Sequence, residues 1–72
     1  MELTKLEKEV LEIIKEYASE LDMPTSEMLD IIKEKGIEKN VAKGVIGSLV
    51  KKEQVKMLEV NGEPTVWYEG GN

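Results

Sequence analysis

The sequence predicts an α+β domain in which three helices are followed by a two-stranded antiparallel β-hairpin. Apolar residues recur at intervals of three and four residues as far as residue 52, which is the periodicity of amphipathic helices. From residue 54 the apolar residues instead alternate with polar ones, as in a strand with one buried face. An Asn-Gly pair at 61–62 separates two such segments and is a strong signal for a tight hairpin turn.

The first helix is expected at residues 4–20. Thr4 is followed three residues later by Glu7, the spacing of a capping box in which each side chain satisfies a backbone N–H at the helix start. The helix should end before Pro24, because the residue that precedes a proline is disfavoured in helical geometry. The apolar residues of this helix form one stripe that should pack on the core: Leu6, Val10, Ile13, Ile14 and Tyr17.

Two further helices are expected, at residues 26–35 and 38–52. Thr25 or Ser26 can supply the N-cap oxygen of the earlier one. Gly36 follows that helix in the position where a left-handed residue often ends one. Two helices joined through one glycine should diverge at a large angle.

The helix at 38–52 divides into an apolar half and a polar half. At about 100° per residue, the half that should face the core contains Val41, Ala42, Val45, Ile46, Leu49 and Val50. The opposite half contains Asn40, Lys43, Gly44, Gly47 and Lys51. Glycine is unusual on an exposed helix face, since each one costs roughly 0.5–1 kcal/mol relative to alanine. We therefore expect Gly44 and Gly47 to allow close approach of a partner to the helix backbone.

The expected strands cover residues 54–60 and 65–69, and residues 70–72 form a frayed tail. Successive side chains of a strand point to opposite faces of the sheet. With few aromatic residues in the chain, Trp67 is expected to cover the core from the second strand, and Tyr68 to face the other way.

Composition limits the chemistry of the chain. Its 72 residues are expected to form a single domain, 1–72. Cys and His are both absent, which removes thiol chemistry, disulfides, the usual zinc ligands and an imidazole base. We therefore expect a protein that is not an enzyme and has no metal site and no cofactor. No apolar segment approaches the ~20 residues of a membrane span, so we expect a cytoplasmic location without membrane contact.

Charge is distributed unevenly along the chain. The formal net charge is −5 and there is no arginine, yet residues 36–57 carry five lysines against two acidic residues. The flanking segments are acidic, with three lysines against seven acidic residues in 1–22 and none against three in 58–72. A basic island of this kind can face phosphate locally although the whole chain is acidic.

The order of two helices, a glycine turn between them and a following hairpin resembles the winged helix-turn-helix DNA-binding domains of transcriptional regulators. The positions that carry the resemblance are Thr25, Gly36, Ile37, Glu38, Asn40 to Lys43, Ile46, Leu49 and the pair Lys51 and Lys52. In this family the second helix of the pair enters the major groove, and the wing touches the DNA backbone or the minor groove. The resemblance therefore implies a small regulator that binds double-stranded DNA through the helix at 38–52.

The same resemblance assigns the DNA contacts to Lys39, Asn40, Lys43, Gly44, Gly47 and Lys51, with Lys52 and Lys56 on phosphates. Three features depart from the family pattern. Glu38 replaces the usual hydroxyl cap, Lys43 replaces an arginine and so loses its bidentate fork, and the wing tip at 61–63 carries no cation. Binding by one copy is therefore expected to be weak and to depend on a homodimer.

Other functions are open on the sequence alone. The lysines can form an ordinary solvated face, and a winged helix can serve as a protein–protein interaction module in which Gly44 and Gly47 admit a partner helix. The segment 43–48 is similar to the Gly-x-x-Gly loop of KH RNA-binding domains, but helical periodicity continues through it. A catalytic domain is disfavoured by the missing His and Cys.

Overall fold

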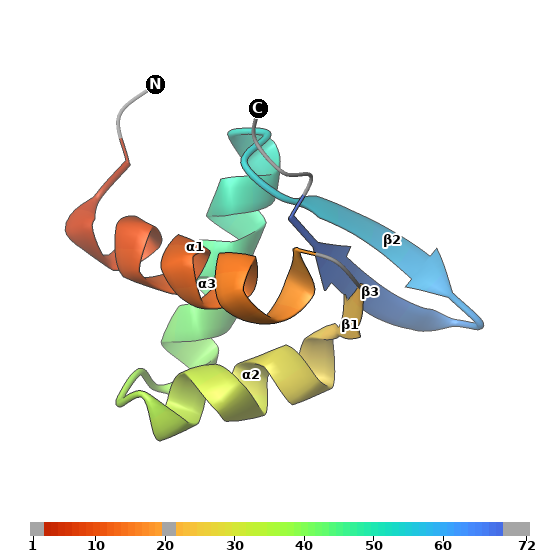
Figure 1. Ribbon diagram of the computed structural model, residues 1–72, viewed down its shortest axis with the longest axis horizontal. Helices are drawn as coiled ribbons and strands as arrows, with labels where there is room; N and C mark the ends of the chain where they lie inside the picture. The colour runs from red at the N-terminus through yellow and green to blue at the C-terminus, as the bar shows by residue number, and fades with distance from the viewer. Residues whose placement is uncertain (1–2, 20–21, 69–72) are drawn as a thin grey trace.

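The computed structural model describes residues 3–19 and 22–68, and this part of the chain contains three helices and three strands. Figure 1 shows α3 crossing behind α1, with α2 below α1 and the hairpin extending to one side. The elements are α1 (Lys5–Ala18), β1 (Met23–Pro24), α2 (Thr25–Glu34), α3 (Lys39–Lys51), β2 (Lys56–Val60) and β3 (Glu63–Trp67). The α+β class and the order of helices and hairpin are confirmed. The expected strand end at 69 and the tail at 70–72 lie outside the described residues.

The sheet has three strands, in the order β1-β3-β2, so the expectation of two strands is wrong. β1 pairs with β3 in antiparallel register, Met23 opposite Val66 and Pro24 opposite Thr65. From the sequence, Pro24 is expected only to end the first helix. A proline favours extended geometry in the residue before it, and its missing N–H is tolerated on an edge strand. The partner of this short strand lies far along the chain, where local patterns do not reach.

The hairpin turn lies where the Asn-Gly pair predicts it. β2 and β3 pair from Lys56 opposite Trp67 to Val60 opposite Glu63. Asn61 and Gly62, the two residues between the strands, both have positive φ, 54° and 79°. Positive φ at both central residues is the geometry of the type I′ turn, which matches the twist of the strands.

The buried face of α1 is rotated away from the predicted stripe. Val10 and Ile14 are fully buried as expected, but Tyr17 is exposed and Leu11 is buried. The centre of the buried face also includes Glu7. An acidic residue in the middle of a buried face interrupts the apolar periodicity, so the periodicity predicts a different face.

The start of α2 differs from the expectation. Thr25 is the first residue of the helix, and Pro24 occupies the N-cap position without a side-chain hydrogen bond, so neither Thr25 nor Ser26 is the cap. Thr25 is buried, and its Oγ1 has no hydrogen-bond partner in the described part of the chain. Because Pro24 pairs with β3 in extended geometry, it takes the N-cap position, one residue before the expected cap at Thr25.

Tyr68, and not Trp67, packs on the core. Val66 is fully buried, and Tyr68, two residues later on the same face, lies against the buried cluster. The N–H of Tyr68 donates a 2.8 Å hydrogen bond to the carbonyl of Ala18 at the end of α1. Trp67 is half-buried and opposes Lys56 in the register of the hairpin. The alternation of side chains along β3 allows either of its faces to be buried. The hydrogen bond to α1 places the face with Val66 and Tyr68 against the core.

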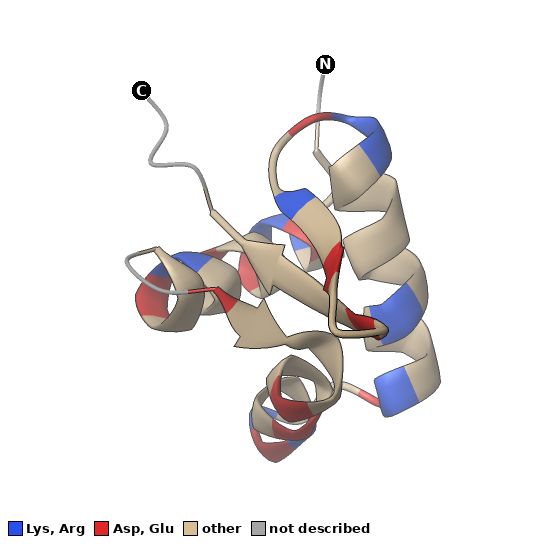
Figure 2. Cartoon of the chain, turned by 90° about the vertical axis from the view of Figure 1, so that its right-hand side faces the viewer, with Lys and Arg blue, Asp and Glu red and all other residues tan. Residues whose placement is uncertain are grey.

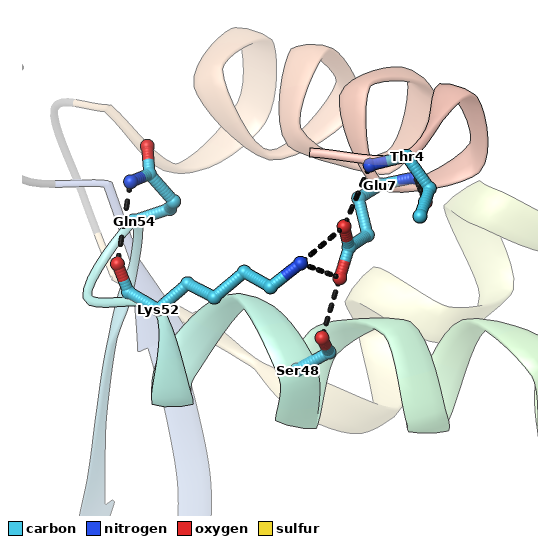
Figure 3. A network of polar contacts seen from close by, with 5 residues as sticks. All are labelled: Thr4, Glu7, Ser48, Lys52 and Gln54. Atoms are coloured by element: carbon cyan, nitrogen blue, oxygen red, sulfur yellow. Dashed lines mark hydrogen bonds and ion pairs between the residues drawn. The ribbon is translucent and has the colours of Figure 1, made fainter. Parts of the chain in front are cut away.

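Glu7 joins the start of α1 to the C-terminal end of α3 (Figure 3). The expected capping box is present, with Thr4 N–H donating to Glu7 Oε1 at 2.8 Å and Glu7 N–H donating to Thr4 Oγ1 at 3.1 Å. The same carboxylate also accepts hydrogen bonds from Lys52 Nζ, at 2.8 and 3.1 Å, and from the Ser48 hydroxyl. The Glu7 and Lys52 side chains are only 6% and 21% exposed.

These contacts favour the ionised form of Glu7. The hydrogen bond from Lys52, followed by those from Ser48 and the Thr4 backbone, lowers the pKa of Glu7 from 4.5 to about 2. Because the folded-state pKa is the lower one, the unfolded chain takes up the proton first as the pH falls. The network therefore stabilises the fold fully above about pH 4.5, and this contribution is lost as the pH falls toward 2.

Replacing Glu7 with glutamine should lower the melting temperature at pH 7, since Lys52 would lose its counter-charge. The difference from the unmodified chain should shrink as the pH falls from about 4.5 to 2. Thermal unfolding across this pH range measures the effect, with Glu9→Gln on the exposed side of α1 as the matched control. Parallel pH profiles for the Glu7→Gln and unmodified chains would contradict the assignment.

Candidate nucleic-acid interface

α3 is held between α1 and α2 by one buried face. Ala42, Ile46 and Leu49 are buried in the core cluster that also includes residues of α1 and α2. Gly36, between α2 and α3, has a φ of 97°, a conformation that side-chain-bearing residues rarely adopt. Its N–H donates to the carbonyl of Lys33, which closes the end of α2 and redirects the chain into α3. The predicted role of Gly36 is therefore confirmed.

The side of α3 opposite the core is exposed and contains no carboxylate. All five residues on this side of the helix are exposed, and α3 contains no Asp or Glu. Figure 2 shows lysines recurring along α3, in contrast to the mixed or acidic colouring of the other elements. We define the α3 face as these five residues: Asn40, Lys43, Gly44, Gly47 and Lys51.

The backbone at Gly44 and Gly47 is open to the surroundings. A Cβ atom added at either position would meet no heavy atom within 4 Å. The glycines are therefore not required for packing within the described domain. With no side chain at either position, a ligand can approach the helix backbone there.

The other predicted contact residues lie outside the α3 face. Lys39 forms a 2.6 Å ion pair with Asp30 of α2, and both side chains are about half exposed, at 49% and 62%. Such a surface pair contributes little stability, so Lys39 can exchange it for a phosphate. Lys52 forms the ion pair with Glu7, a structural role that no local pattern in the sequence indicates. Lys56 is exposed on β2.

Acidic residues lie at the start of α3 and on the hairpin. Glu38 is the N-cap residue of α3, is exposed and makes no side-chain capping hydrogen bond. Glu59 and Glu63 lie on the hairpin, which appears with acidic bands in Figure 2. These two hairpin carboxylates disfavour phosphate near the turn, so a nucleic acid on α3 would depend on the helix for most of its contacts.

Val41 is a further departure from the predicted apolar half of α3. It is 43% exposed, whereas Val45 and Val50 are partly buried against the core. Ser48 lies two turns later on the same side of the helix, where it donates a hydrogen bond to Glu7 of α1. α1 thus covers the later part of this side and leaves Val41 uncovered.

Two surface hollows of the described residues are lined partly by acidic side chains. One, of about 360 Å³, has Asp22 and Glu63 among its lining residues, and the other, of about 400 Å³, includes Glu12 and Glu16. The second also contains Lys15 and Lys35, so its charges are mixed. Within residues 3–19 and 22–68 there is no cluster of three or more side chains suited to a metal ion, nor a helix with the length and apolar composition to cross a bilayer.

Comparisons of the chain with protein-family models, with curated proteins and with solved structures gave no match. A function must therefore be argued from the chemistry of the surface. The α3 face combines exposure, positive charge and an open helix backbone.

Replacing Gly44 and Gly47 with alanine should raise the free energy of unfolding by about 0.5–1 kcal/mol at each position. The added methyl groups have room, and alanine restricts the unfolded chain. Chemical denaturation of the double variant measures the gain. Gly36→Ala is the control and should destabilise, because of its φ of 97°. A loss of stability in the double variant would show that the two glycines pack against other parts of the chain.

Proposed function

We propose that this chain is a winged helix-turn-helix domain that binds double-stranded DNA, with α3 in the major groove. The observation that carries the proposal is the composition of the exposed α3 face, which combines lysines and an asparagine with two glycines and no carboxylate. Lysine can contact phosphate or the acceptor atoms of guanine, and asparagine can pair with adenine. The glycines let the helix backbone lie close to the groove wall.

The order of elements supports the same proposal. Two helices joined through Gly36 are followed by a hairpin, which is the order that the resemblance implies. The acidic hairpin and the net charge of −5 weaken DNA binding, so the proposed affinity is low for one copy. We leave Lys52 out of the contact set because it is committed to Glu7.

The dependence of affinity on salt should be shallow. Four lysines, Lys39, Lys43, Lys51 and Lys56, are exposed in the basic segment. Neutralising at most four phosphates limits the slope of log affinity against log salt concentration to about −3.6 per copy. Titration of a labelled random duplex at several salt concentrations measures this slope. No binding at low salt would overturn the proposal.

Charge reversal on the α3 face should abolish duplex binding without unfolding the domain. Lys43→Glu and Lys51→Glu together would put two carboxylates on a face that now has none, and neither residue is in the core. The matched control is Lys5→Glu with Lys8→Glu, which changes the net charge equally on exposed positions of α1. Equal loss of binding in both double variants would indicate an effect of net charge alone, and not a contact at α3.

A second candidate function is an interaction module that binds a partner helix through α3. The exposure of Val41 beside the open glycines supports it, since an apolar side chain next to two glycines suits close helix packing.

The Gly44→Ala, Gly47→Ala variant tests whether DNA binding requires close approach to the backbone of α3. It should lose duplex binding while gaining stability. Retained affinity would show that the DNA contact lies elsewhere.

A further inference from the structure

β2 is an exposed edge strand. Among the described strands it pairs only with β3, and all five of its residues are exposed. Figure 1 shows it along the outer side of the sheet, on the side away from α2. Three of its residues are large and apolar, with exposed fractions of 36% for Met57, 55% for Leu58 and 42% for Val60. An edge with these properties is a template for pairing with another strand.

The opposite edge of the sheet is protected. β1 contains only two residues, and one of them is Pro24, which has no N–H to donate. Short length and proline are two of the devices by which proteins prevent pairing at an edge. β2 contains no proline, and its register with β3 is continuous over five residue pairs. The sheet can therefore be extended at β2 and not at β1.

We propose that β2 pairs with β2 of a second copy of this chain, antiparallel about a two-fold axis at Leu58, so that a homodimer has one continuous six-stranded sheet. In this register Leu58 lies opposite its own counterpart. Met57 lies opposite Glu59 of the second copy, and Lys56 lies opposite Val60. Paired residues in an antiparallel ladder share a face of the sheet, and each of these pairs satisfies that condition.

The neighbouring registers are less favourable. An axis at Glu59 places the two Glu59 carboxylates directly opposite each other, which is destabilising. An axis at Met57 requires Val55 to pair, but Val55 is buried and precedes the strand. Only the axis at Leu58 pairs all five residues of β2 without opposing like charges. This self-complementarity favours a second copy over an unrelated peptide as the occupant.

Charge complementarity supports the same register. Val60 is paired with Glu63 within each hairpin. Lys56, opposite Val60 of the second copy, therefore lies in line with that copy's Glu63 on the same face of the sheet. The two positions are separated by two strand spacings, about 10 Å between backbones, which long lysine and glutamate side chains can bridge. Two-fold symmetry forms this ion pair twice.

The dimer should be weak and depend on concentration. Pairing of one five-residue strand buries less than the ~1,200–2,000 Å² of a stable interface. Sedimentation equilibrium of the full chain should show a mass that rises from 8.1 kDa toward twice that value as concentration increases, and then stops. A monomer throughout the millimolar range would overturn the proposal. Growth beyond the dimer would also overturn it, since the two-fold contact closes on itself.

A substitution at the two-fold axis tests whether the dimer forms through β2 or through another surface. Leu58→Lys would place two ammonium groups opposite each other and should raise the dissociation constant at least about tenfold. Val41→Lys, at the exposed apolar residue of α3, is the matched control and should leave it unchanged. Circular dichroism confirms that both variants fold. The reverse pattern would place the interface on α3 and overturn the proposal.

A charge swap tests the register itself. Lys56→Glu and Glu63→Lys should each weaken the dimer, because each places like charges in line across the interface. The double variant Lys56→Glu, Glu63→Lys should recover an affinity within about threefold of the unmodified chain. Additive losses in the double variant would overturn the proposed register. These measurements use no DNA, so their outcome is independent of the proposed function.

Discussion

The carboxylate of Glu7 connects the start of α1 to the end of α3, and the exposed surface depends on that connection. A buried carboxylate is costly unless its oxygens are satisfied by donors. Here the Thr4 backbone N–H, the Ser48 hydroxyl and the Lys52 ammonium all donate to it. Because Ser48 lies on α3 and Lys52 is its C-cap residue, the network holds one side of that helix against α1. The opposite side, with Lys43 and Lys51, is thereby directed outward.

This arrangement also separates structural lysines from surface lysines. Lys52 is adjacent to Lys51 in sequence, yet one is held by Glu7 and the other is exposed. For a nucleic acid on α3, which lysines are exposed matters more than the net charge of −5. At physiological ionic strength, charges more than about 8 Å away are largely screened, so a ligand on α3 responds mainly to that face and its border. Glu38 lies at the start of α3 and limits the proposed affinity.

The two edges of the sheet have different consequences. β1 secures the hairpin to the segment between α1 and α2, and its shortness ends the sheet there. β2 continues the sheet outward with exposed backbone and apolar side chains. The proposed dimer at β2 would bring two α3 faces into one particle. Two such faces would present Lys43 and Lys51 of both copies to one nucleic acid, which offsets the small number of lysines on each copy.

The sequence alone determined the features that depend on local patterns. The helical periodicity, the capping box of Thr4 and Glu7, the glycine at 36 and the Asn-Gly turn all lie within a few residues of the geometry that they specify. The exposure of the α3 face also followed from periodicity, since its five residues lie opposite Ala42 and Ile46.

Tertiary structure decided what local patterns leave open. The partner of β1, the ion pair between Glu7 and Lys52, and the choice of Tyr68 over Trp67 for the core each join segments far apart in the sequence. Periodicity gives the spacing of a buried face but not its neighbour, so it cannot show that α1 stops short of Val41. These contacts arise only when the helices and strands are packed together, because burial and pairing depend on which surfaces meet.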